Sequence, residues 1–153
     1  MGRARRVVPS ALVVLALAGF LISFYLTITH YRNLVPPCYV VTGCESVVTS
    51  RFSTILGIPL SLIGTVFFAV MFYLGIALLT SSRRLVVRAY ELLAFLGILA
   101  AIVLLLLQAL VLKAYCIYCL GTEVIALLIW AGSLVAASSR DEGTASESGS
   151  RRR

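Results

Sequence analysis

Long apolar stretches separated by short polar ones are the main feature of this chain. A helix needs about 20 apolar residues to cross the hydrocarbon core of a bilayer. Four windows meet that length, and they cover residues 7–29, 58–80, 89–112 and 116–137. The strongly polar side chains inside the windows are Glu91, Gln108 and Glu123. Backbone groups in lipid must be bonded internally, and the alternating strands of a barrel are not visible in the sequence. The pattern therefore predicts an all-α membrane protein, a four-transmembrane-helix bundle.

The two ends of the chain need separate interpretation. The N-terminal MGRARR before an apolar run resembles a signal peptide, but the apolar core of a signal peptide has only 7–15 residues. The first run is longer, so we expect an anchor helix that is kept. The last segment, 138–153, contains Ser, Gly and charged residues with almost nothing apolar to bury. This composition predicts a disordered tail after one membrane domain, 1–137.

Composition and charge support the membrane interpretation. The chain has 153 residues, of which 61% are hydrophobic and 12% charged, whereas soluble domains are about half apolar and about a quarter charged. The net charge of +7 comes from residues at chain ends and in short loops. The sequence has no cluster of basic residues with aromatic residues between them. We therefore expect no nucleic-acid binding. Of the 13 basic residues, 10 fall on the side of both termini, so the positive-inside rule predicts cytoplasmic termini and an extracytoplasmic loop over 30–57.

All four cysteines are expected on the extracytoplasmic side. Cys38 and Cys44 lie in the long loop, and Cys116 and Cys119 lie where the fourth window begins. Thiols in an oxidising compartment form disulfides. In a Cys-x-x-Cys motif at a helix start, the two residues share one face, and the free N–H groups there favour a thiolate. A thiolate at 116 or 119 would be competent in thiol–disulfide exchange. One fixed pair and one pair on a loop indicate an electron relay.

Other interpretations of the cysteines stay open from the residues alone. The four thiols could form two static disulfides in a non-enzymatic four-helix membrane protein. They could also form a four-thiolate zinc site, but an oxidising location and a bundle that folds without metal disfavour it, so we expect no metal. A small transporter is a third interpretation, but the predicted spans contain few of the charged residues that a transporter would use.

A dithiol at the lipid boundary needs a two-electron acceptor. The chain has no flavin or nucleotide fingerprint and no haem-ligand cluster, whereas a lipid-soluble quinone can reach such a site laterally. Glu123 lies four residues after Cys119, one turn deeper on the same face. A carboxyl group inside a span is a functional hypothesis by default, and it could relay a proton or be a structural acid. His30 is expected to be a solvated interface residue. Aromatic side chains that could line a pocket are Phe20, Phe24, Tyr25, Phe67, Phe68, Phe72, Tyr115 and Tyr118.

An ordered set of motifs carries a resemblance to a known family. Cys38-x5-Cys44 is followed by Ser50, by Gly57-Ile58-Pro59 at the start of a window, and by CIYC at 116–119. Over residues 10–137 this order resembles the vitamin K epoxide reductase family, and its prokaryotic members most. The resemblance implies a helix bundle around a quinone (menaquinone, ubiquinone or related). It also implies a protein that reoxidises a thioredoxin-like partner and supports disulfide formation. Many prokaryotic members carry a fused thioredoxin-like domain that this chain lacks, so we expect the partner to be a separate protein.

The resemblance also implies a role for individual residues. It makes Cys38 and Cys44 the shuttle pair, and Cys116 and Cys119 the active-site pair. Cys44 is expected to exchange with Cys116, while Cys119 faces the quinone. Ser50 is expected to position the quinone or the helix beneath it. Animal members have a tyrosine four residues after the motif, where this chain has Glu123, so reduction of vitamin K epoxide is not inferred.

Overall fold

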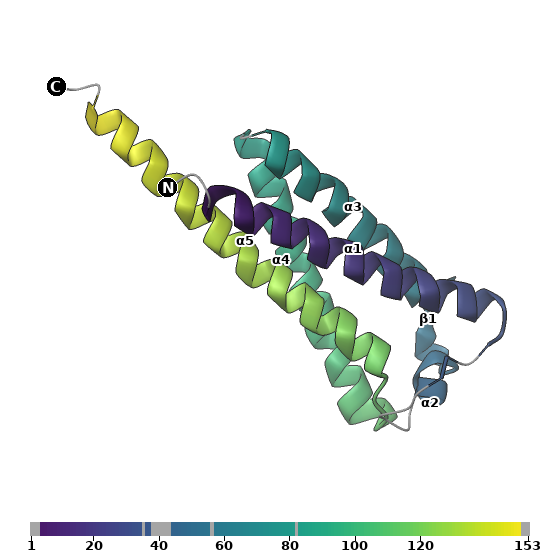
Figure 1. Cartoon of the computed structure of the whole chain (residues 1–153). Coiled ribbons are helices and arrows are strands. Elements are labelled where there is room, and N and C mark those ends of the chain that lie inside the picture. Colours follow the sequence, from purple (N-terminus) through teal and green to yellow (C-terminus); the bar gives the residue numbers. More distant parts are fainter. Residues whose placement is uncertain (1–3, 35, 38–43, 56, 82, 151–153) are drawn as a thin grey trace.

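The computed structural model describes residues 4–34, 36–37, 44–55, 57–81 and 83–150, with the backbone alone for 4–6, 51, 137 and 139–150. Four long helices make up most of this part of the chain (Figure 1). They are α1 (Ala4–Tyr31), α3 (Leu60–Thr80), α4 (Arg84–Leu106) with its π-helical continuation η2 (Leu107–Leu112), and α5 (Ile117–Ser150). Each contains a stretch long and apolar enough to cross a membrane. The predicted four-helix membrane bundle is therefore confirmed.

Two helices begin at positions that differ from the apolar windows. α3 begins at Leu60 because Ile58 and Pro59 form a short strand, β2, which pairs antiparallel with β1 (Thr54–Ile55). Proline has no N–H to donate to a preceding helical turn, so it suits this boundary. α4 begins at Arg84, earlier than the expected residue 89. Hydropathy marks where lipid begins, whereas polar side chains can occupy helical turns outside the lipid.

The end of the chain differs from the expectation of a disordered tail. α5 continues as helix from the fourth span to Ser150, which includes most of the segment 138–153. None of the chain's four prolines lies in this segment. Adding a residue to a formed helix is far easier than nucleating a new one, so the helix propagates into polar sequence.

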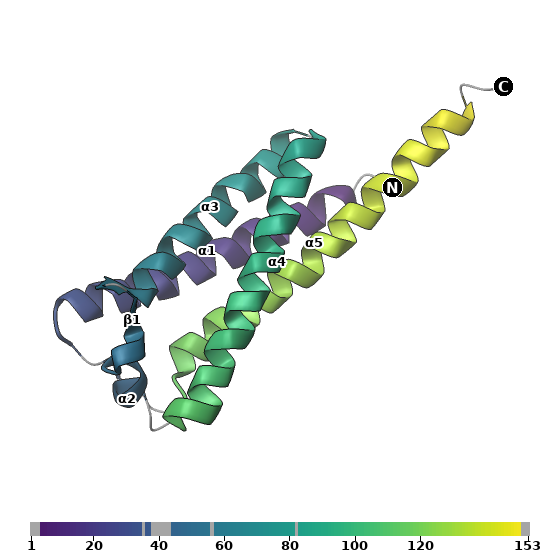
Figure 2. The same cartoon turned by 180° about the vertical axis from the view of Figure 1, so that it is seen from behind.

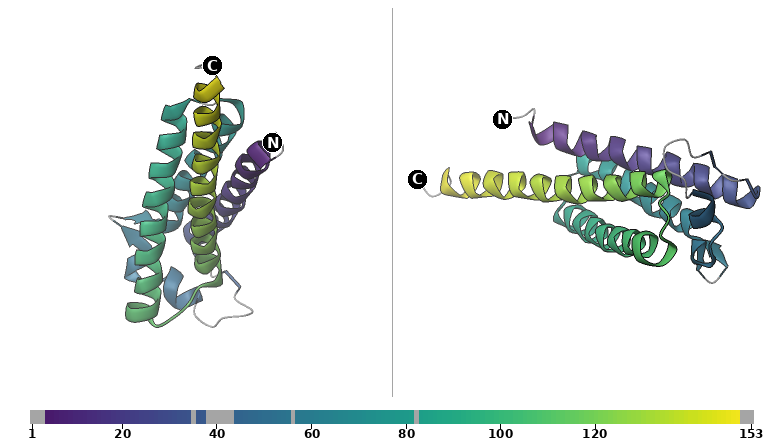
Figure 3. Two further views of the ribbon diagram at one scale, coloured as in Figure 1. Left: turned by 90° about the vertical axis from the view of Figure 1, so that its left-hand side faces the viewer. Right: turned by 90° about the horizontal axis from the view of Figure 1, so that it is seen from below.

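Each of the four long helices packs against two of the others. α1 packs along α3 and α5, and α4 packs along α5 and α3. Both broad views show α3 and α4 meeting at the connection between them and diverging toward the opposite end, where α2 (Cys44–Val48) lies (Figure 2). The N-terminal end of α1 and the later part of α5 lie at the end of the bundle away from α2 (Figure 3). The bundle is thus closed at one end and open at the other.

A small residue and a polar contact hold α1 close to α3. A Cβ atom at Gly19 would lie 2.5 Å from the ring of Phe68, so α1 and α3 could not approach as they do with any larger side chain there. Thr27 and Thr65 share a hydrogen bond of 3.1 Å between the same helices. Close backbone approach and polar contacts of this kind hold membrane helices together.

A short irregular segment covers the open end. It contains α2, the 3₁₀ turn η1 (Arg51–Ser53) and the β1–β2 hairpin, whose turn includes Gly57 at a φ of 82°. This left-handed backbone favours glycine, which has no Cβ to clash. α2 also contacts η2. The segment therefore reaches from α3 across to the end of α4.

Candidate functional site: a dithiol beside an apolar cavity

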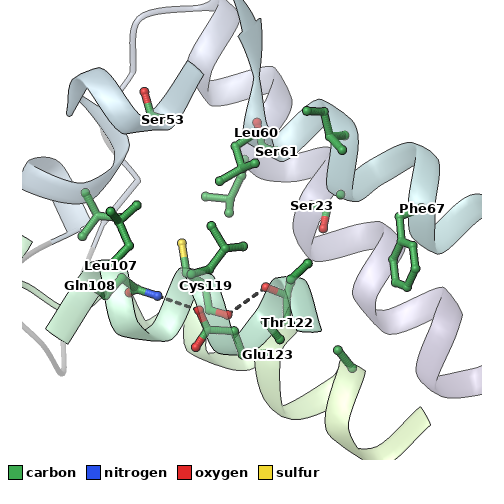
Figure 4. A pocket seen from close by; sticks show the side chains of 18 of the residues that line it. Ser23, Ser53, Leu60, Ser61, Phe67, Leu107, Gln108, Cys119, Thr122 and Glu123 are labelled. Carbon is green, nitrogen blue, oxygen red and sulfur yellow. Dashed lines mark hydrogen bonds between the residues drawn. The ribbon is translucent and has the colours of Figure 1, made fainter. Parts of the chain in front are cut away.

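A cavity of about 380 Å³ lies between the diverging helices, beneath α2 and η1. Residues of α1, α3, α4, η2 and α5 line it, and most of its surface is apolar. Figure 4 shows the sulfur of Cys119 among the lining side chains, with Gln108, Thr122 and Glu123 beside it. Pockets of this size commonly take small organic ligands. The cavity therefore provides space for a ligand next to the thiol of Cys119.

The two cysteines of the Cys-x-x-Cys motif have different surroundings. Cys119 lines the cavity, whereas Cys116 is fully buried just before α5 begins. Both are free thiols, and the thiol of Cys119 donates a hydrogen bond to the sulfur of Cys116. Cys119 thus contacts the ligand space, and Cys116 lies behind it.

Cys116 is the N-cap residue of α5. Its carbonyl oxygen accepts the N–H of Leu120 at 2.9 Å, and its sulfur accepts the backbone N–H groups of Tyr118 and Cys119. These are the second and third residues of the helix, whose N–H groups an N-cap side chain usually satisfies. The hydrogen bond from the Cys119 thiol, aided by these N–H groups and opposed by burial, lowers the pKa of Cys116 from about 9 to about 7. The thiolate that the motif predicts is therefore stabilised at Cys116.

The loop cysteines are only partly within the described residues. Cys44 begins α2, is 1% exposed and is disulfide-bonded. Since Cys116 and Cys119 are free, the disulfide of Cys44 involves neither of them. Cys38 lies outside the described residues, so its role as the partner of Cys44 stays a prediction.

Gln108 was not singled out as a site residue by the sequence. Its side-chain nitrogen donates a hydrogen bond of 2.7 Å to Oε1 of Glu123. Its side-chain oxygen accepts the backbone N–H of Cys116 at 3.1 Å. The signal that could have found it is one amide in an otherwise apolar window. Glu123 also has a buried oxygen, Oε2, without a hydrogen-bond partner in the described part of the chain.

The other expected site residues lie at or near the cavity. Ser50 lines it, and its hydroxyl donates to the carbonyl of Val47 at 2.8 Å. His30 differs from the expectation of a solvated residue, because it is half-buried and lines the cavity. Of the eight aromatic residues named from the sequence, only Phe67 and Phe68 line it, together with Phe52, which was missed. The aromatic residues that do not line it lie elsewhere on the helices or near their ends, where hydropathy cannot distinguish lipid from cavity.

A membrane helix bundle with a dithiol at the edge of an apolar cavity is typical of membrane proteins that carry out thiol redox chemistry. The chain belongs to the vitamin K epoxide reductase family, whose model matches residues 10–134, most of its length. It is therefore a multi-pass membrane oxidoreductase of a family whose enzymes use quinones. A search among curated proteins found no match.

Proposed function

We propose that the protein is a thiol:quinone oxidoreductase that reoxidises a separate thioredoxin-like partner and thereby supports disulfide formation. The observation that carries this proposal is the position of Cys119, a free thiol that lines an apolar cavity and donates a hydrogen bond to the Cys116 sulfur. One sulfur of the dithiol thus faces a ligand space, while the other is fully buried beside it.

The lining of the cavity fits a quinone such as menaquinone or ubiquinone. The volume of about 380 Å³ and the largely apolar surface suit a ring with part of an isoprenoid chain. Ser50, Gln108 and Glu123 supply polar groups at the same cavity. Oε2 of Glu123, which has no hydrogen-bond partner among the described residues, is available for a proton. A bound quinone would take up two electrons and two protons. The residues that would hold it are Ser50, Phe67 and Glu123, beside Cys119.

Electrons would reach the active-site pair by thiol–disulfide exchange. A reduced partner first converts the shuttle disulfide of Cys38 and Cys44 to two thiols. The Cys44 thiolate then attacks Cys116 in the Cys116–Cys119 disulfide, which forms a mixed disulfide and releases Cys119 as a thiolate. Cys38 attacks Cys44, re-forms the shuttle disulfide and releases Cys116. One disulfide has been made and one reduced, so atoms and electrons balance.

After this exchange Cys44 would be in a disulfide, and Cys116 and Cys119 would be thiols. Cys44 is disulfide-bonded, and Cys116 and Cys119 are thiols. A dithiol that re-forms its disulfide gives up two electrons and two protons. The lowered pKa of Cys116 means that one of these protons leaves readily near neutral pH. Glu123 lies one turn below Cys119 and could hold a proton beside the cavity.

The test uses the purified full chain in detergent or lipid. A bound quinone in its lipid extract, and quinone reduction driven by dithiothreitol, are expected for the wild-type protein. Cys119→Ala is expected to abolish the reduction, because the sulfur at the cavity is lost. Leu110→Ala serves as the control, since Leu110 is exposed on the helix surface. If all the cysteines stay in disulfides that resist mild dithiothreitol, and no quinone is present, the protein is a static disulfide-bonded bundle instead.

A further inference from the structure

Gln108 connects the two reactive ends of the site. The residue is 3% exposed and lies in η2, the π-helical continuation of α4. Its one side chain bonds both to the backbone N–H of Cys116 and to the carboxyl group of Glu123, over 3.1 Å and 2.7 Å. π-helical turns are rare and frequently occur at functional sites. A buried amide in this position is costly unless both of its ends are bonded, and here both are.

The direction of the amide follows from its partners. A backbone N–H can only donate a hydrogen bond, so the group of Gln108 that faces Cys116 must be the oxygen. The nitrogen of the amide then faces Glu123, and a side-chain amide nitrogen can only donate. Oε1 of Glu123 must therefore accept. When Glu123 carries a proton, that proton must lie on Oε2, the buried oxygen that has no partner among the described residues.

The other end of the amide fixes the start of α5. The N–H of an N-cap residue has no partner inside its own helix. In a capping box, a glutamine or glutamate three residues into the helix satisfies it, whereas here Gln108 does so from α4. The backbone of Gln108 is itself held, because its carbonyl oxygen accepts the N–H groups of Lys113 and Ala114. Lys113 has a φ of 49°, which turns the chain sharply out of η2.

We infer that Gln108 is a positioning residue that sets the place of the Cys116 sulfur and keeps the proton of Glu123 on Oε2. A single side chain thus orients the group that takes part in disulfide exchange and the group that holds a proton at the cavity. The inference rests on the proposed function, and it adds the residue that links the two chemical events. Nothing in the sequence motifs assigns this role to Gln108.

Two single substitutions separate the two ends of the amide. Gln108→Glu keeps an oxygen for the Cys116 N–H but removes the donor toward Glu123. Gln108→Leu removes both bonds. Losing hydrogen bonds of this kind costs about tenfold or more in rate where they matter. We expect kcat for quinone reduction to fall about tenfold or more in both variants, while Leu110→Ala on the same η2 segment stays within about twofold.

A second measurement follows exchange without quinone. In a Cys119→Ser background, the rate at which a Cys44–Cys116 crosslink forms is read by non-reducing peptide mapping. We expect Gln108→Leu to slow crosslink formation several-fold, because the start of α5 is released. Gln108→Glu and Glu123→Gln are expected to leave that rate within about twofold of the background, although each lowers turnover. A kcat of Gln108→Leu within about twofold of wild type would overturn the inference.

The double variant Gln108→Glu/Glu123→Gln decides between positioning and simple structural support. It re-forms both hydrogen bonds with the amide and the acid exchanged, so thermal stability should return to the wild-type level and crosslinking in the Cys119→Ser background should stay unchanged. Turnover should stay low, because the carboxyl group no longer lies one turn below Cys119. Recovery of turnover would show a merely structural role and overturn the inference. If the Cys119→Ser variant crosslinks but the wild-type protein reduces no quinone, the proposed function is wrong, while the crosslink rates would still test the role of Gln108 at Cys116.

Discussion

The hydroxyl group of Tyr118 donates a hydrogen bond of 3.0 Å to the carbonyl oxygen of Pro37. Tyr118 lies within the Cys-x-x-Cys motif, and Pro37 immediately precedes Cys38 in the sequence. The tyrosine ring also lies against the ring of Tyr25, with 5.7 Å between the centroids. Through Tyr118, the first turn of α5 therefore holds the chain at Pro37, immediately before Cys38 in the sequence.

Tyr118→Phe tests whether this bond guides the two cysteine pairs together. The variant keeps the ring packing and removes only the hydroxyl group. A hydrogen bond of this type contributes about 0.5–1.5 kcal/mol, so we expect crosslinking between Cys44 and Cys116 to slow about two- to tenfold in a Cys119→Ser background. Tyr115→Phe is the matched control, because Tyr115 is exposed and makes no hydrogen bond through its hydroxyl in the described part of the chain. Equal rates for both variants would mean that the loop is guided by other contacts.

The titration of Cys116 gives a second prediction. Because its pKa is lowered to about 7, the thiolate persists as pH falls to about 7, whereas an ordinary thiol is almost fully protonated there. The largest cause is the donor at Cys119. With Cys38 and Cys44 replaced by Ser, Cys119→Ser keeps a donor and should titrate near pH 7. Cys119→Ala removes the donor and should titrate at higher pH.

The ultraviolet absorbance of the thiolate measures this titration without a reagent that must reach a buried sulfur. In both variants Cys116 is the only remaining thiol, so the signal belongs to one group. Identical midpoints in the two variants would contradict a role for the hydrogen bond from residue 119.

The sequence predicted the four helices well because each span must bury about 20 apolar residues in lipid, which leaves a plain hydropathy signal. It also placed Cys119, Ser50 and Glu123 at what is one cavity in the structure. Hydropathy could not predict the contact of Gln108 with Cys116, because this contact depends on the π-helical end of α4 and on the left-handed turn at Lys113. It also could not separate the aromatic rings that line the cavity from those that do not.

The expectation of a disordered tail over 138–153 differs from the structure for a related reason. Low apolar content shows that residues 138–150 have little to bury, but it does not say whether a helix already formed in the membrane will stop. Nothing in that segment forces the helix to break, and α5 continues to Ser150. Composition alone therefore predicts where packing ends better than where a helix ends.

Gly97 limits the shape of the cavity. A Cβ atom added there would lie 2.5 Å from the ring of Phe67, which lines the same cavity. Gly97→Ala must therefore push this ring aside. We expect KM for a quinone to change several-fold, while crosslinking of Cys44 to Cys116 in a Cys119→Ser background is unaffected. Gly121→Ala is the control, because its nearest neighbour, Ile22, lies at an ordinary 3.9 Å. A large loss of thermal stability without a change in KM would assign Gly97 to packing alone.

The orientation of the bundle is predicted from the 10 basic residues on one side against 3 on the other. An impermeant thiol reagent should label Cys38 and Cys44 in intact cells after mild reduction. Variants with Ser at both positions should lose this labelling, which assigns the label to the loop cysteines. Labelling that appears only after the membrane is permeabilised would place the loop in the cytoplasm, and the oxidation would then serve cytoplasmic proteins.

The last prediction concerns the bond that joins the two cysteine pairs. In Cys119→Ser, a hydroxyl group replaces the thiol that pairs with Cys116, so the Cys116 thiolate is left to attack the disulfide of Cys44. In Cys38→Ser, Cys44 has no shuttle partner and attacks the active-site disulfide. Both variants should therefore accumulate a Cys44–Cys116 crosslink, whereas Cys44→Ser should form none.

The structure makes this crosslink reasonable, but the existing disulfide of Cys44 must open for it to form. Cys44 begins α2, which contacts η2 near the start of α5, and both sulfur-bearing residues are buried. A disulfide requires the two Cα atoms to come within about 7 Å. Because Cys44 is already disulfide-bonded, exchange must release that bond as the new one forms. Non-reducing peptide mapping identifies the linked peptides directly. If neither Cys119→Ser nor Cys38→Ser links residues 44 and 116, the two pairs do not exchange, and electrons must reach Cys119 without the loop.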